Sequence, residues 1–148
     1  MFIFIQIIHT ILNNSSLLPI FSIISTSTLH TITGNILDDG SINHSKVNKG
    51  EGKYAMTMKV NSLNYLQHLN EDIYNQFTNT KIYAYPNNSL PQYKGKEIIQ
   101  YYFRTNTHLF FFTALHVLWY EWDNGKNKFY KLVPLNIFKM FSEISLAY

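Results

Sequence analysis

The pattern of hydrophobic and polar positions divides most of the chain into helices and strands. Apolar residues recur at helical spacing after Ser62, which predicts an amphipathic helix against a core. Period-two alternation in Lys53–Val60 predicts a strand with one apolar face and one basic, polar face. The expected elements are a helix over Ser27–Asp38, strands over Ser41–Lys46 and Lys53–Val60 joined by a turn at Asn48–Gly52, a helix from the N-cap Ser62 to Phe77, strands over Lys81–Tyr85 and Glu97–Thr105 joined by a loop over Pro86–Gly95, a helix over His108–Trp122 capped by Asn106 or Thr107, a turn at Asp123–Gly125, an extended segment over Lys128–Val133, and a short helix from Pro134 to Phe141.

This order of helices and strands predicts an α+β fold with an antiparallel sheet. A chain of 148 residues forms one domain and can bury a core without disulfides. It has no cysteine, which excludes disulfides and thiolate metal sites, and its six histidines lack the spacing of a zinc site. We expect an apolar lead-in of uncertain structure over 1–26, the main domain over 27–141 and a tail over 142–148.

The lead-in begins with the apolar segment Met1–Leu12. This segment lacks the basic residues of a secretory signal or a mitochondrial presequence. It is also shorter than the ~20 residues that cross a bilayer, so no stable membrane insertion is expected.

Two adjacent carboxylates, Asp38 and Asp39, stand immediately before Gly40 at the end of the first predicted helix. The negative end of a helix dipole disfavours carboxylates there, and a divalent cation that needs clustered oxygen ligands would offset that cost. A hairpin turn at Asp39-Gly40 explains the same residues equally well.

Three segments in order resemble the LAGLIDADG homing endonucleases. The first resembles the family's first signature, an apolar helix that ends in an acid-Gly pair. The second resembles its Lys-x-x-Pro-x-Asn-Ile element, and the third resembles the opening of its second signature. The three segments are Ile32–Gly40, Lys131–Ile137 and Phe141–Tyr148.

The resemblance implies a half-saddle with the order αββαββα, whose antiparallel sheet lies in a DNA groove. It implies that Asp39 binds Mg²⁺ or another divalent cation and is catalytic, with Asp38 as a second metal ligand. It also implies a catalytic role for Lys131, which would polarise the attacking water or offset charge on the phosphate. Gly34 resembles the small residue at which two signature helices pack closely, although the neighbouring Thr33 and Asn35 are more polar than the motif usually shows.

One face of the implied sheet carries the candidate DNA-binding residues. Major-groove base edges are distinguished by donors and acceptors, which a strand presents with period two. A formal charge of +3 and a pI near 9.0 suit a polyanionic partner. The candidates are Asn43, Ser45, Lys53, Thr57, Lys59, Lys81, Tyr83, Gln100, Tyr102 and Arg104.

The function implied is a site-specific DNA endonuclease that makes metal-dependent double-strand breaks. The tail resembles the start of a second signature without its acid, so we expect either a homodimer or the need for a second half, and a truncated or degenerate gene product is an alternative. An intron-RNA-binding maturase with the same fold is the alternative function. The abundance of Ile, Asn, Lys, Phe and Tyr indicates A+T-rich coding, from which we expect an intron-encoded mitochondrial protein that needs no import signal.

Overall fold

The structure is a computed structural model in which the described residues are 24–44, 52–78, 81–106 and 110–148. Some sequence predictions lie outside these residues. They are the lead-in up to residue 23, the end of the first strand with the candidate Ser45, the turn at 48–51 and the cap Thr107.

The first described helix, α3 (Thr26–Leu37), agrees with the predicted signature helix to within one residue at each end. Ser25 is its N-cap, and the Ser25 hydroxyl accepts a hydrogen bond from the Thr28 backbone N–H at 3.1 Å. Leu29 and the residues from Thr31 to Ile36 are buried and His30 is half-buried, so most of α3 lies inside the molecule.

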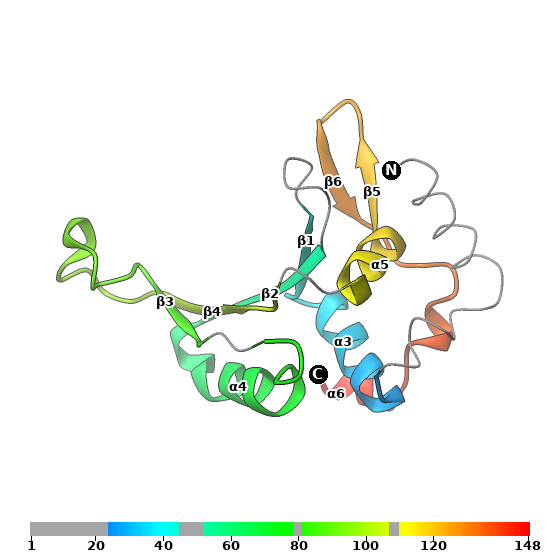
Figure 1. Cartoon of the computed structure of the whole chain (residues 1–148), viewed down its shortest axis with the longest axis horizontal. Coiled ribbons are helices and arrows are strands. Elements are labelled where there is room, and N and C mark those ends of the chain that lie inside the picture. Colours follow the sequence, from blue (N-terminus) through cyan, green and yellow to red (C-terminus); the bar gives the residue numbers. More distant parts are fainter. Residues whose placement is uncertain (1–23, 45–51, 79–80, 107–109) are drawn as a thin grey trace.

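Four strands form one antiparallel sheet in the order β1-β2-β4-β3. Figure 1 shows this sheet extending sideways from α3 into the long connection between β3 and β4. The α+β class and the antiparallel sheet are confirmed, with β3 and β4 shorter than predicted. The strands are β1 (Ser41–His44), β2 (Gly52–Lys59), β3 (Tyr83–Tyr85) and β4 (Gln100–Arg104).

The inner face of this sheet packs into the hydrophobic core. Tyr54 and Met56 of β2 are fully buried, whereas Thr57 between Met56 and Met58 is exposed, as the predicted alternation requires. The ring of Tyr54 stacks on Tyr74 at 4.5 Å and on Phe112 at 6.0 Å, both measured between ring centroids. Tyr74 follows α4 and Phe112 belongs to α5, so both helices cover the same face of the sheet. Among the described residues, no helix packs on the opposite face.

The predicted helix from Ser62 to Phe77 begins earlier and ends earlier than expected. A 3₁₀ turn over Val60–Ser62 leads into α4 (Leu63–His68), and a π-helical turn over Leu69–Ile73 follows. Ser62 is the N-cap residue of α4, as predicted, but it belongs to the preceding 3₁₀ turn and its side chain makes no capping hydrogen bond. The chain leaves the helix at Tyr74, where the ring turns inward onto Tyr54.

The predicted helix over His108–Trp122 is wrong at its C-terminal end. The helix α5 (Phe110–Trp119) stops at Trp119, and β5 (Tyr120–Asp123) pairs with β6 (Lys128–Lys131) in a separate hairpin. The Asp123 carboxylate closes the turn, since it accepts hydrogen bonds from the backbone N–H groups of Gly125 and Lys126. The hairpin is an addition to the αββαββα order.

The C-terminal segment contains little regular structure before its last helix. The predicted short helix from Pro134 to Phe141 is only a 3₁₀ turn over Ile137–Lys139, because exposed Leu135 and Phe138 provide no apolar stripe to bury. Helix α6 (Glu143–Ala147) then packs beside α3 (Figure 1). None of the described helices is long and apolar enough to cross a membrane.

Candidate active site and nucleic-acid interface

The C-terminal end of α3 carries the two predicted metal ligands. Asp38 is the C-cap, and its backbone N–H donates to the Gly34 carbonyl at 3.2 Å. The Gly40 N–H donates to the Asn35 carbonyl at 2.7 Å, which closes the turn and leaves Asp38 and Asp39 exposed. Within the described chain, neither carboxylate makes an ion pair within 4.0 Å. Both are therefore accessible to a cation from solvent.

The side chain of Lys131, the last residue of β6, extends to the C-terminal end of α3. Its ammonium donates to the backbone carbonyls of Ile36 at 2.7 Å and Gly40 at 2.9 Å, with a longer contact of 3.4 Å to that of Asp38. Helix ends leave such carbonyls without intrahelical partners, so the ammonium satisfies oxygens that α3 itself cannot. Partial loss of hydration lowers the pKa of Lys131, while the nearby Asp39 and Asp38 act to raise it.

The structure thus brings Lys131 to the same end of α3 as Asp38 and Asp39, although more than ninety residues separate it from them in sequence. The position of Lys131 depends on the hairpin, in which Lys131 pairs with Tyr120. The hydroxyl of Tyr120 accepts a hydrogen bond from the Ile42 N–H of β1 at 3.0 Å and ties the hairpin to the main sheet. Sequence reasoning found the lysine but not its support, because no Gly or Pro separates Tyr120 and Trp122 of β5 from the mostly apolar helix before them.

A stack of aromatic rings strengthens the joint between the hairpin and β1. His116 of α5 stacks between His44 and Tyr120, with 4.7 Å between ring centroids on each side, and Phe129 of β6 meets it edge-on at 4.6 Å. Burial, together with the adjacent His44, lowers the pKa of His116 to about 3. His116 is therefore neutral at physiological pH.

The donor atoms at the end of α3 suit a hard divalent cation. They are the carboxylates of Asp38 and Asp39 and the backbone carbonyls that now face Lys131, all of them oxygens. Mg²⁺ and Ca²⁺ prefer such ligands, whereas zinc prefers imidazole and thiolate. No cluster of three or more His, Asp or Glu side chains occurs in the described parts of the chain, so backbone oxygens are an essential part of this donor set.

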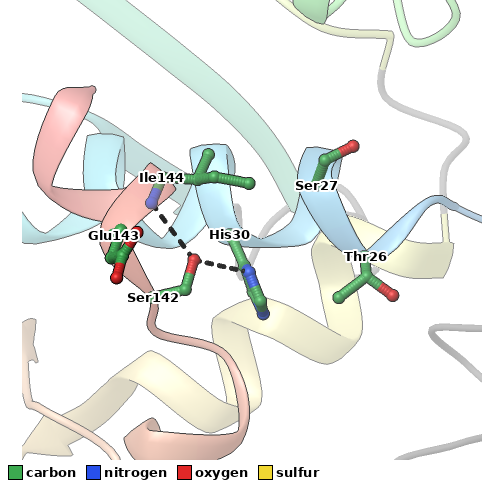
Figure 2. Close-up of a pocket in the computed structure, with 6 residues that line it drawn as sticks. All are labelled: Thr26, Ser27, His30, Ser142, Glu143 and Ile144. Carbon is green, nitrogen blue, oxygen red and sulfur yellow. Dashed lines mark hydrogen bonds between the residues drawn. The ribbon is translucent and has the colours of Figure 1, made fainter.

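Gly34 lies where α3 and α6 approach most closely. A Cβ at this position would overlap the backbone carbonyl of Ser145. The Ser145 hydroxyl donates to the His30 carbonyl at 2.8 Å, and the Ser142 hydroxyl lies 2.7 Å from His30 Nδ1. Figure 2 shows Ser142 between His30 and the backbone N–H of Ile144, at a shallow pocket beside the two helices. Gly34 therefore permits helix packing, and its partner is α6 of the same chain.

The unusual polar residues of the signature helix, Thr33 and Asn35, both form side-chain hydrogen bonds. Thr33 donates its hydroxyl to the Leu29 carbonyl at 2.8 Å. The fully buried Asn35 accepts from the Tyr74 hydroxyl at 2.9 Å and donates to the Tyr148 carbonyl at 2.9 Å. Asn35 joins α3 to the segments that follow α4 and α6, so the departure from the motif carries a structural role.

The outward face of the main sheet carries most of the other predicted residues in register. Ser41, Ala55 and Arg104 form one row across the strands, and the next rows combine Thr57 with Tyr102 and Tyr83, and Lys59 with Gln100 and Tyr85. Asn43 opposite Lys53 extends this face along β1 and β2. Lys81 is exposed just before β3, so it lies next to the sheet rather than within it.

Aromatic and cationic groups are interleaved on this face. The rings of Tyr83 and Tyr102 stack with 5.5 Å between centroids, and the Arg104 guanidinium lies over the Tyr102 ring at 5.2 Å. Tyr85, which the sequence analysis omitted, shares the face with Tyr83. Strand parity alone would have identified it.

Comparison with known proteins adds one finding. The sequence model of the LAGLIDADG DNA endonuclease family matches residues 29–148. No curated protein matches the chain.

Proposed function

The chain belongs to the LAGLIDADG DNA endonuclease family, and from this premise we propose that it is a site-specific DNA endonuclease that hydrolyses phosphodiester bonds with the help of Mg²⁺ or another divalent cation. The observation that carries the proposal is the convergence of Lys131 on the end of α3 beside Asp38 and Asp39. Family members bind DNA and are typically dimeric or two-domain.

In this proposal Asp39 is the main ligand of the cation, with Asp38 and the backbone carbonyls of the helix end as further ligands. When bound, the ion supplies Lewis-acid stabilisation of the phosphate and lowers the pKa of water. Hydrolysis forms a bond between water oxygen and phosphorus and breaks the bond to the 3′ oxygen. Lys131 offsets negative charge on the five-coordinate phosphate or polarises the attacking water.

The outward sheet face is the proposed DNA-binding surface. Its side chains stand with period two on adjacent strands, and Lys53, Lys59 and Arg104 give the face positive charge. Such a surface combines attraction for phosphates with donors and acceptors for base edges.

A complete site for cutting both strands needs a second acid, which we propose comes from a second copy or a second half. The α3 face around Gly34 is covered by α6, so two copies of α3 could pack there only if α6 moved. We also propose that the protein is intron-encoded and acts in the mitochondrion, as the coding bias suggests.

Intron-RNA binding in splicing is a second candidate function. The observation that favours it is the exposure of Tyr83 and Tyr85, each 45% accessible, on the sheet face where Arg104 lies over the Tyr102 ring. Exposed aromatic rings and guanidinium groups stack on unpaired RNA bases.

A cleavage assay with Mg²⁺ tests the leading proposal. The substrate is DNA spanning the intronless form of the host gene, and the comparison is the native chain with Asp39→Asn. We expect cutting by the native chain that is absent in the variant. A folded, DNA-binding chain that never cuts would contradict the nuclease proposal, and splicing of the host intron would then be measured with the same two proteins.

A further inference from the structure

The ammonium of Lys131 occupies the oxygens that a metal ion would need. Three backbone carbonyls, those of Ile36, Gly40 and Asp38, direct their oxygens at Nζ over 2.7, 2.9 and 3.4 Å. Hard cations bind this kind of oxygen together with carboxylates, and the two carboxylates are adjacent. The helix end thus already holds a cation, and that cation is part of the protein.

We propose that Lys131 is the resident cation of the α3 end, and that its ammonium and a divalent ion are alternative occupants of these carbonyl oxygens. The inference rests on the proposed function, because it concerns the regulation of the same site. Two positive centres cannot share one set of oxygens at such short range without strong repulsion. Entry of the ion therefore requires Nζ to leave.

The ammonium has few other attachments. Lys131 is an exposed residue at the end of β6, and neither Asp38 nor Asp39 forms an ion pair with it within 4.0 Å in the described structure. Its flexible four-carbon stem can carry Nζ away without moving the strand. Displacement of Nζ therefore breaks only the contacts to the carbonyls.

Displacement would also change what Lys131 can do. An ammonium has three N–H donors, and three carbonyls now face them. Once an ion replaces the ammonium, these donors become available to a phosphate or a water. Lys131 thereby acts as an internal cap in the metal-free protein and reaches the substrate only after metal binding.

Binding of Ca²⁺ without DNA tests this competition. Ca²⁺ accepts backbone carbonyl ligands and supports the measurement by calorimetry, with Tb³⁺ luminescence as a second probe. The test variant is Lys131→Met, and the matched control is Lys128→Met, which removes the same charge from the same strand. We expect Lys131→Met to bind Ca²⁺ about tenfold more tightly than the native chain, and Lys128→Met to bind within about twofold of it.

The gain in affinity should depend on the carboxylate. Adding Asp39→Asn to Lys131→Met should abolish the gain. If Lys131→Met binds no more tightly than Lys128→Met, or if no variant binds Ca²⁺ at millimolar concentration, the competition proposal is wrong.

Nuclear magnetic resonance of the lysine ammonium groups gives a test that needs no variant. In the metal-free protein the Lys131 ammonium protons should exchange slowly with water, because carbonyls hold them. With saturating Ca²⁺, the Lys131 ammonium protons should exchange with water as fast as those of the exposed Lys128. Bound Ca²⁺ with an unchanged Lys131 signal would overturn the proposal.

These results separate the inference from the proposed function. DNA cleavage that depends on Asp39, without tighter Ca²⁺ binding in Lys131→Met, would retain the nuclease and reject the competition. Tighter Ca²⁺ binding in Lys131→Met without any cleavage of DNA would retain the competition and reject the nuclease proposal.

Discussion

The end of α3 and the outward face of the sheet both carry predicted functional residues, but they are built differently. At the end of α3, Lys131 bonds to backbone oxygens more than ninety residues away, and Ile36 and Gly40, which supply the two shortest contacts, are buried. On the sheet face, Thr57 and Arg104 are exposed, and the Arg104 guanidinium lies over the ring of Tyr102. We therefore expect changes at the helix end to alter stability and chemistry together, and changes on the sheet face to alter affinity alone.

The largest expected effect comes from Gly34→Ala, which tests how tightly the signature helix is enclosed. Alanine favours a helix by about 1 kcal/mol, but its Cβ would overlap the Ser145 carbonyl, a backbone atom that cannot rotate away. We expect a net loss of about 2 kcal/mol in the free energy of unfolding, measured with urea. Gly125→Ala is the control, because its Cβ would meet only the flexible Asp123 side chain, at 3.3 Å. Equal stabilities of the two variants would contradict the observed α3–α6 packing.

Loss of the ammonium at the helix end should have the next largest effect of a substitution at neutral pH. Lys131→Met keeps the length of the side chain but leaves the carbonyls of Ile36 and Gly40 without this donor. Because the residue is exposed and water can replace part of the interaction, we expect a loss of about 1 kcal/mol in metal-free buffer. Lys128→Met should stay within about 0.5 kcal/mol of the native chain. A neutral effect of Lys131→Met would mean that the contact to α3 contributes nothing to folding.

Acid should weaken the packing of His116 against His44, Tyr120 and Phe129, which helps to position Lys131. The pKa of His116 is lowered from 6.5 to about 3 by burial and by His44, so the fold favours its neutral form. Its contribution to stability is complete above pH 6.5 and is lost as the pH falls toward the folded-state value. Relative to His116→Gln, the native chain should lose about 1 kcal/mol per pH unit between pH 6.5 and about pH 5 in urea unfolding. Parallel pH profiles of the two proteins would show that His116 is not held neutral.

The smallest effect on stability is expected on the sheet face. Arg104→Ala should change the free energy of unfolding by no more than about 0.5 kcal/mol, yet weaken DNA binding by about tenfold and reduce the salt dependence by about one ion. Lys126→Ala in the hairpin turn removes the same charge away from this face and should bind nearly as the native chain. Equal losses in both variants would indicate attraction by net charge alone.

The sequence predicted best those features that depend on local periodicity or on a contiguous motif. The bounds of α3 and the alternation in β2 follow from neighbours along the chain, and the assignment of Arg104 to the outward face needs only strand parity. The roles of Asp39 and Lys131 in catalysis stay predictions, although the structure brings the two residues to the same helix end.

Features that depend on contacts between distant segments were missed. Tyr120–Trp122 was assigned to the preceding helix because no Gly or Pro separates it from that mostly apolar segment, and pairing with β6 makes it a strand. The structural role of Asn35 was also missed, because its hydrogen-bond partners, Tyr74 and Tyr148, lie far away in sequence. No local pattern encodes the bond from Lys131 to the carbonyls of α3.

The most direct test of the central claim measures DNA binding and DNA cleavage together, on one substrate with Mg²⁺, for Asp39→Asn and Arg104→Ala. If the end of α3 performs the chemistry and the sheet face holds the substrate, Asp39→Asn should bind within about twofold of the native chain and cut nothing. Arg104→Ala should bind more weakly and still cut once DNA saturates it. Cleavage by Asp39→Asn at the native rate would contradict the assignment of the active site to the end of α3.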